Sequence, residues 1–135
     1  MGGFKVKDIL LDTHIWIWIS IEQYENLSKK AKEAVKQAKR KWISAISMWE
    51  LAKLVEKNRI AFSIPLISWI KRSLFECEIL VAHLEPEICV ESCSLQGFHQ
   101  DPVDQLIVAT SRVLSLPLIS ADRRIQEFKG VRIIW

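Results

Sequence analysis

The stretch from residue 101 to residue 125, DPVDQLIVATSRVLSLPLISADRRI, constrains the fold more than any other part of the sequence. It opens with Asp101 and Pro102, and proline is favoured at the first position of a helix. Apolar residues then recur at helical spacing, and Pro117 ends the helix. The apolar run at residues 118–119 is too short for a helix, so a buried strand is expected there.

Two acidic residues accompany this helix and strand. Asp104 lies in the first turn of the expected helix, and Asp122 lies just past the expected strand. Ligands of open α/β sheets bind at the edge formed by the carboxyl ends of the strands. Two carboxylates that reach this edge suggest a site for a hard cation, which prefers oxygen ligands.

The rest of the chain alternates short apolar runs with segments of helical spacing. The apolar runs predict strands at residues 9–11, 42–44, 79–81 and 132–135, the last of them at an edge. Helices are expected over residues 13–21, 28–38, 46–57, 65–75 and 85–95. The first of these segments is also compatible with a strand, because Trp and Ile favour sheets, but its Asp-Thr entry favours a helix. This alternation predicts an α/β domain with a parallel sheet.

Composition limits the class of protein. The 135 residues suit a single domain spanning residues 1–135, and the 50% hydrophobic content excludes a disordered chain. A net charge of +3 permits an acidic partner such as nucleic acid without requiring one. Asp12 and His14 interrupt the apolar run near the start, so neither a signal peptide nor a membrane span is expected. We therefore expect a cytoplasmic protein that does not associate with membranes.

Lysine and arginine residues cover much of the expected helix that begins near Ser28. They are Lys29, Lys30, Lys32, Lys36, Lys39, Arg40 and Lys41. A solvated helix face explains them most simply, and contact with phosphates is the alternative.

Four acids, Asp12, Glu50, Asp104 and Asp122, each follow an expected strand or begin an expected helix. Each also has a structural explanation, because Asp caps helices and acids are stabilised at helix N-termini. Right-handed crossovers place all these helix starts at one edge of a parallel sheet. Taken together, the four acids therefore predict a cluster at that edge.

Glu50 distinguishes the two explanations. If Ser47 begins the helix, Glu50 completes a capping box and turns back to the helix start. If Ser44 begins it, Glu50 lies a turn further in and is free to point into the cleft. Ser44 directly ends the expected strand, so the second arrangement is favoured.

Other chemistry finds less support in the sequence. Asp101 precedes Pro102 and is expected to cap the helix more readily than to bind a ligand. The histidines lie at scattered positions and form no recognisable nucleophile motif with a nearby serine or cysteine. The glycines form no phosphate-binding loop.

Four segments resemble those of PIN domains, in particular the VapC-type toxin ribonucleases of type II toxin–antitoxin pairs. Each carries one of the four acids, in the order found in the family. The segments are LLDTHIWIW with Asp12, SAISMWELAKL with Glu50, DPVDQLIVATS with Asp104 and LISADRRI with Asp122. Each motif alone is weak, but four in the same order with similar spacing are a strong signal. The chain departs from the family at Gln105, where many relatives carry arginine, and near Asn58, where glycine is common.

The resemblance implies a PIN-like three-layer α/β/α domain with a central parallel sheet of four to five short strands. It also implies an endoribonuclease that depends on Mg²⁺ or Mn²⁺. Asp12, Glu50 and Asp104 would then position metal and water, Asp122 would complete the site, and Thr13 and Asp101 would be auxiliary. One or two metal ions are both compatible with these residues.

The resemblance further implies that the protein binds RNA as substrate, forms a homodimer and binds a small antitoxin protein. An exposed apolar patch, with Trp16, Trp18 and Trp69 as candidates, would suit such contacts. Two alternatives remain: a catalytically inert PIN-fold module that binds RNA or protein, and a phosphatase with its aspartate after the first strand. A haloacid-dehalogenase-type phosphatase needs a second aspartate two residues after the first, where this chain has His14.

Overall fold

The computed structural model describes residues 7–135 and contains a five-stranded sheet with the order β3-β2-β1-β4-β5. Every neighbouring pair of strands is parallel. The strands are β1 (Ile9–Leu11), β2 (Lys41–Ser44), β3 (Ile79–Ala82), β4 (Leu118–Ile119) and β5 (Ile133–Ile134). The predicted parallel sheet is therefore confirmed, with β1 at its centre and β5 at one edge.

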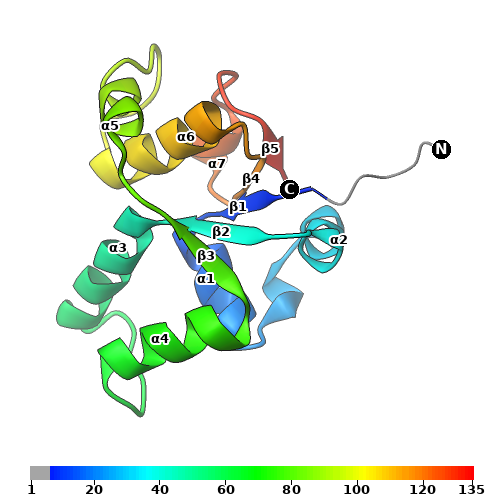
Figure 1. Ribbon diagram of the computed structural model, residues 1–135, viewed down its shortest axis with the longest axis vertical. Coiled ribbons are helices and arrows are strands. Elements are labelled where there is room, and N and C mark those ends of the chain that lie inside the picture. Colours follow the sequence, from blue (N-terminus) through cyan, green and yellow to red (C-terminus); the bar gives the residue numbers. More distant parts are fainter. Residues whose placement is uncertain (1–6) are drawn as a thin grey trace.

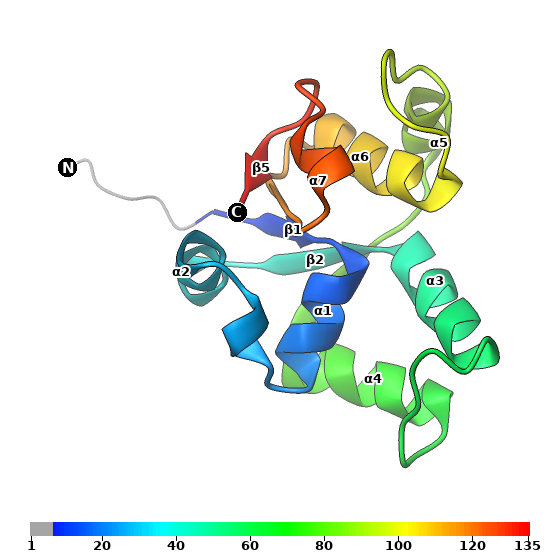
Figure 2. The same cartoon turned by 180° about the vertical axis from the view of Figure 1, so that it is seen from behind.

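Helices cover both faces of this sheet and form three layers (Figure 1). One face carries α1 (Thr13–Ser20), the short 3-10 helix η1 (Tyr24–Asn26), α2 (Lys29–Gln37), α3 (Ala45–Glu56) and α4 (Leu66–Glu76). The other carries α5 (Pro86–Ser92), α6 (Pro102–Leu114) and α7 (Arg123–Gln126), as Figure 2 shows from behind. The expected helix over residues 85–95 is shorter than predicted, and α7 was not predicted.

Each face of the sheet has its own apolar core. Ile9 and Leu11 of β1 point into the first core, which includes the buried side chains of α1, α2 and α3. Leu10 points the other way, into a second core with Ile107 of α6 and Ile125 of α7. This alternation is the period of two expected for a strand that is buried on both faces.

The chain turn after α3 explains one departure from the family. Asn58 follows the C-cap of α3 and has a φ of 58°, in the left-handed region. Glycine adopts this conformation without strain, and asparagine tolerates it better than most residues. Asparagine is therefore one of the few residues other than glycine that suit this backbone position.

The lysine-rich helix α2 lies beside the start of β2, far from α3 and α6 (Figures 1 and 2). Ala31 and Val35 pack inward, whereas Lys29, Lys32 and Lys36 are exposed. This arrangement agrees with a solvated face. Among residues 7–135, no helix is both long and apolar enough to span a membrane.

The tryptophans contradict part of the expected exposed patch. Trp16 is fully buried between α1 and α4, where its Nε1 donates a hydrogen bond to the Ser73 hydroxyl at 2.8 Å. Trp18 and Trp69 are half-buried, whereas Trp49 of α3 is 52% exposed. The prediction failed for Trp16 because tryptophan and isoleucine alternate along α1. This pattern does not show which side chains face the sheet.

Trp16→Phe should lower the free energy of unfolding by about 2 kcal/mol, because it leaves a cavity and removes the hydrogen bond to Ser73. Trp49→Phe is the matched control and should change stability by less than about 0.5 kcal/mol, because Trp49 is largely exposed. Urea denaturation followed by circular dichroism measures both. Equal losses in the two variants would contradict the placement of Trp16 in the core.

Candidate active site

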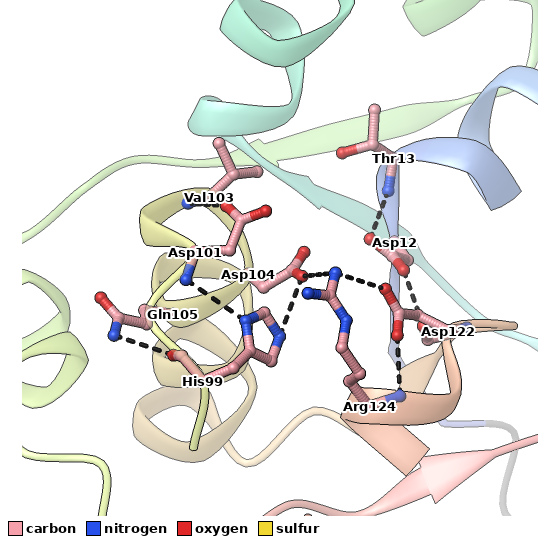
Figure 3. Close-up of polar contacts among 10 residues, drawn as sticks. Asp12, Thr13, His99, Asp101, Val103, Asp104, Gln105, Asp122 and Arg124 are labelled. Carbon is pink, nitrogen blue, oxygen red and sulfur yellow. Dashed lines mark hydrogen bonds and ion pairs between the residues drawn. The ribbon is translucent and has the colours of Figure 1, made fainter.

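The four predicted acids line one cleft at the carboxyl edge of the sheet, between α1, α3, α6 and α7. The cleft has a volume of about 400 Å³. Its lining residues are Asp12, His14, Trp18, Glu50, Asp101, Asp104, Ala121, Asp122 and Arg124. Figure 3 shows how several of these side chains converge from strand ends and helix starts.

Asp12 lies deepest in this cleft. It ends the central strand β1 and caps α1, so its carboxylate accepts a hydrogen bond from the Thr13 backbone N–H at 2.8 Å. Its second oxygen accepts a hydrogen bond from the Ser120 hydroxyl, at 2.6 Å, at the end of the neighbouring strand β4. Burial raises the pKa of Asp12, and these two hydrogen bonds act in the opposite direction.

Glu50 reaches the cleft because Ser44, and not Ser47, caps α3. The Ser44 hydroxyl accepts a hydrogen bond from the Ile46 backbone N–H at 3.2 Å. Glu50 therefore does not complete a capping box, and the favoured arrangement is confirmed. Burial raises the pKa of Glu50, and the nearby negative charges of Asp12 and Asp101 add to this effect.

Asp104 is a second buried carboxylate of the cleft whose pKa is raised. Asp104 is only 7% exposed, and its Oδ2 atom lies 3.2 Å from His99 Nε2. Burial raises the pKa of Asp104 to about 7, and the neighbouring carboxylates Asp12, Asp101, Asp122 and Glu50 contribute to this rise. The cleft is thus a site of crowded negative charge, as expected where carboxylates gather to bind a cation.

Asp122 and Asp101 combine capping with a place in the cleft. Asp122 caps α7 by accepting a hydrogen bond from the Arg124 N–H at 2.8 Å, and Asp101 caps α6 by accepting one from the Val103 N–H at 3.0 Å. Both side chains still line the cleft. Capping and clustering, which the sequence presented as alternatives, are therefore compatible.

Two residues discussed above lie around the cleft rather than in its lining. Thr13 is fully buried, and its hydroxyl donates a hydrogen bond to Ser47 at 2.8 Å, which ties α1 to α3. Its auxiliary role toward water or phosphate stays a prediction. Gln105 donates a hydrogen bond through Nε2 to the His99 carbonyl at 3.0 Å, so it fixes the loop that leads into α6.

Sequence reasoning missed His99 and Arg124. His99 Nδ1 accepts a hydrogen bond from the Asp101 backbone N–H at 3.2 Å, which leaves Nε2 directed at Asp104. Arg124 places a guanidinium nitrogen 3.6 Å from Asp104 and 3.5 Å from Asp122. The only available signal for either was its distance of two residues from an acid, which is too common to be informative.

The donor chemistry of the cleft fits a hard divalent cation. Asp12, Glu50, Asp104 and Asp122 offer only carboxylate oxygens, the ligands that Mg²⁺ and Mn²⁺ prefer. Within residues 7–135, no three Asp, Glu, His or Cys side chains converge closely enough to ligate one ion directly. Some divalent cations, Mg²⁺ among them, keep several waters and need only one or two direct carboxylate ligands.

Comparison with known proteins places this chain in a family. The model of the PIN domain family matches residues 9–131. Ribonuclease VapC22 of Mycobacterium tuberculosis is 34% identical over 125 residues, which cover 92% of this chain and 94% of that protein. The chain therefore belongs to the PIN domain family.

Solved structures share the fold at lower identity. VapBC2 from Rickettsia felis, bound to a DNA fragment from the promoter, superimposes with a TM-score of 0.67 at 15% identity, over 93% of this chain and 96% of that one. VapBC-1 from nontypeable Haemophilus influenzae gives a TM-score of 0.67 at 21% identity, over the same shares. These similarities confirm the three-layer α/β/α architecture.

The raised pKa of Asp104 makes the stability of the metal-free protein depend on pH. Between the ordinary pKa of 3.8 and about 7, the folded state keeps a proton that the unfolded state releases. The contribution of Asp104 to stability should therefore fall as pH rises from about 4 to about 7 and stay level above that. At pH 8 in EDTA, Asp104→Asn should be more stable than the wild type by at least about 1 kcal/mol.

Thermal melts of both proteins at several pH values measure this difference. Glu56→Gln removes an exposed acid of α3 outside the cleft and serves as the control. A constant difference between wild type and Asp104→Asn from pH 4 to pH 8 would show that the Asp104 carboxyl titrates normally.

Proposed function

We propose that this protein is a divalent-cation-dependent endoribonuclease that acts as the toxin of a toxin–antitoxin pair. The observation that carries the proposal is the convergence of four carboxylates in one cleft of a PIN domain. The name of the relative from Mycobacterium tuberculosis, a ribonuclease, supports RNA as the substrate.

In this proposal Asp12, Glu50, Asp104 and Asp122 would hold Mg²⁺ or Mn²⁺, directly or through its bound waters. When bound, the metal lowers the pKa of a water and stabilises charge on the attacked phosphate. Asp12 is the fixed point, because Thr13 and Ser120 hold both of its oxygens. Glu50 reaches the same space from α3 and orients the attacking water.

The remaining groups of the cleft position these acids. His99 Nε2 lies 3.2 Å from the Asp104 carboxylate, while Gln105 holds the backbone of His99. Asp101 faces the cleft from the cap of α6 and adds negative charge beside Asp104. The helix N-termini of α1, α6 and α7 favour the negative charges that the cleft collects.

We further propose a small antitoxin protein as partner and a homodimer as the working form. Several structures with this fold are toxin–antitoxin complexes, among them one from Klebsiella pneumoniae and VapBC from Salmonella typhimurium. The exposed apolar residues, such as Trp49 and Phe75, offer contact area for such partners.

The purified protein should cleave single-stranded RNA with Mg²⁺ or Mn²⁺ and stop when EDTA removes the cation. Gel analysis of a labelled RNA measures the reaction, with Asp12→Asn prepared in parallel to exclude a contaminating nuclease. Cleavage that persists in EDTA would contradict the metal requirement. RNA binding without cleavage under any cation would favour the alternative of an inert binding module.

Glu50→Gln should reduce the cleavage rate at least tenfold, about 1.4 kcal/mol in activation free energy, because the amide carries no negative charge toward the cation. The variant should still fold, since Ser44 and not Glu50 caps the helix. Glu56→Gln lies on the same helix outside the cleft and should leave the rate unchanged. A Glu50→Gln variant with normal activity would remove Glu50 from the proposed site.

A further inference from the structure

Arg124 is a positive charge placed inside an acidic cleft. Of the cleft-lining residues in the described part of the chain, it is the only arginine or lysine. Its guanidinium lies 3.6 Å from Asp104 Oδ2 and 3.5 Å from Asp122 Oδ2, and Figure 3 shows it between the two carboxylates. The side chain thus occupies the region that the proposed function assigns to a divalent cation.

The backbone of Arg124 is fixed while its side chain is not. Its N–H donates to the Asp122 carboxylate at 2.8 Å, and the next residue, Ile125, is fully buried in the core. Gln126 donates a further hydrogen bond to the Ser120 carbonyl at 2.9 Å. The Arg124 side chain, in contrast, is 60% exposed and makes only long contacts. It is therefore an exposed positive charge whose backbone, but not its guanidinium group, is held by a short hydrogen bond.

The contacts of Arg124 with Asp104 and Asp122 are weak enough for a divalent cation to replace the guanidinium. Exposed ion pairs contribute little to stability, because solvent screens them and ordering a long side chain costs entropy. A divalent cation carries twice the charge of a guanidinium and interacts with several carboxylates at once. Arg124 can therefore neutralise the Asp104 and Asp122 carboxylates and still be displaced by the metal.

A guanidinium group displaced from the carboxylates can bind an RNA phosphate at the same cleft. Guanidinium groups bind phosphate oxygens through two parallel hydrogen bonds. The fixed backbone keeps the Arg124 side chain within reach of any phosphate that approaches the Asp104 and Asp122 carboxylates. No other arginine or lysine lines this cleft in the part of the chain that the structure describes.

We infer that Arg124 is an internal counter-ion that occupies Asp104 and Asp122 until a divalent cation displaces it, and that it then binds the RNA phosphate at the cleft. This inference rests on the proposed function, because it takes the metal site and the RNA substrate from it. It predicts that removing the charge of Arg124 strengthens the binding of the divalent cation and weakens the binding of RNA.

Arg124→Gln should bind Mn²⁺ about threefold more tightly than the wild type, because a competing positive charge is gone. Electron paramagnetic resonance of free Mn²⁺ measures this affinity without any turnover. In buffer that contains Ca²⁺, the same variant should bind a fluorescent oligoribonucleotide several-fold more weakly than the wild type does. Fluorescence anisotropy measures this affinity. Arg124→Lys keeps the charge but not the two parallel donors, so its Mn²⁺ affinity should match the wild type and its RNA affinity should lie between the two.

Arg123→Gln is the matched control, because Arg123 precedes Arg124 in the same turn and does not line the cleft. It should leave both affinities unchanged. If Arg124→Gln does not fold, as judged by circular dichroism, Arg124→Met takes its place because it keeps the aliphatic part of the side chain. Failure of both to fold would overturn the inference and assign Arg124 a structural role.

The outcomes separate the inference from the proposed function. A wild type that binds no Mn²⁺ refutes the metal site of the proposed function, and the inference with it. A wild type that binds Mn²⁺ with the same affinity as Arg124→Gln leaves the proposed function standing and overturns the inference. Loss of both Mn²⁺ and RNA affinity in Arg124→Gln also overturns it, since that pattern indicates general damage to α7.

Discussion

The pairing of β1 with β2 on one side and β4 on the other is the constraint on which the site depends. It sets Leu10 opposite Trp42 in one neighbour and Leu118 in the other. Because all three strands run parallel, their carboxyl ends reach the same edge, and the helices that follow begin there. Asp12, Glu50 and Asp122 are brought together by this register and not by any contact among themselves.

Gathering like charges in a buried cleft costs free energy, and the structure offsets that cost locally. Asp12, Asp101 and Asp122 each accept a hydrogen bond from the first turn of a helix, where the helix dipole also favours a negative charge. Asp104 has no such cap, and it is the carboxyl whose pKa rises to about 7. His99 and Arg124 approach it instead. Side chains that can carry a positive charge thus lie near Asp104 in place of backbone donors.

The sequence revealed the sheet and the acids because both depend on local patterns. Short apolar runs identified every strand, and Ser44 could be chosen over Ser47 as the cap of α3 from its place at a strand end. Trp16 was misplaced because tryptophan and isoleucine alternate along α1, so the periodicity does not select the buried side. α7 was missed because four residues are too few to show a helical period. His99 and Arg124 escaped notice because their role depends on tertiary distances to Asp104.

The hydrogen bond from Ser120 to Asp12 joins residues 108 positions apart, across the junction of β4 with the central strand. β1 is made first, yet it gains its second neighbour only when β4 is available. The cleft also needs Asp122 and the start of α7, which follow β4 in the chain. A nascent chain therefore carries no complete cleft until nearly all of the domain has left the ribosome. For a protein proposed to cut RNA, this order of assembly delays activity until the domain is almost complete.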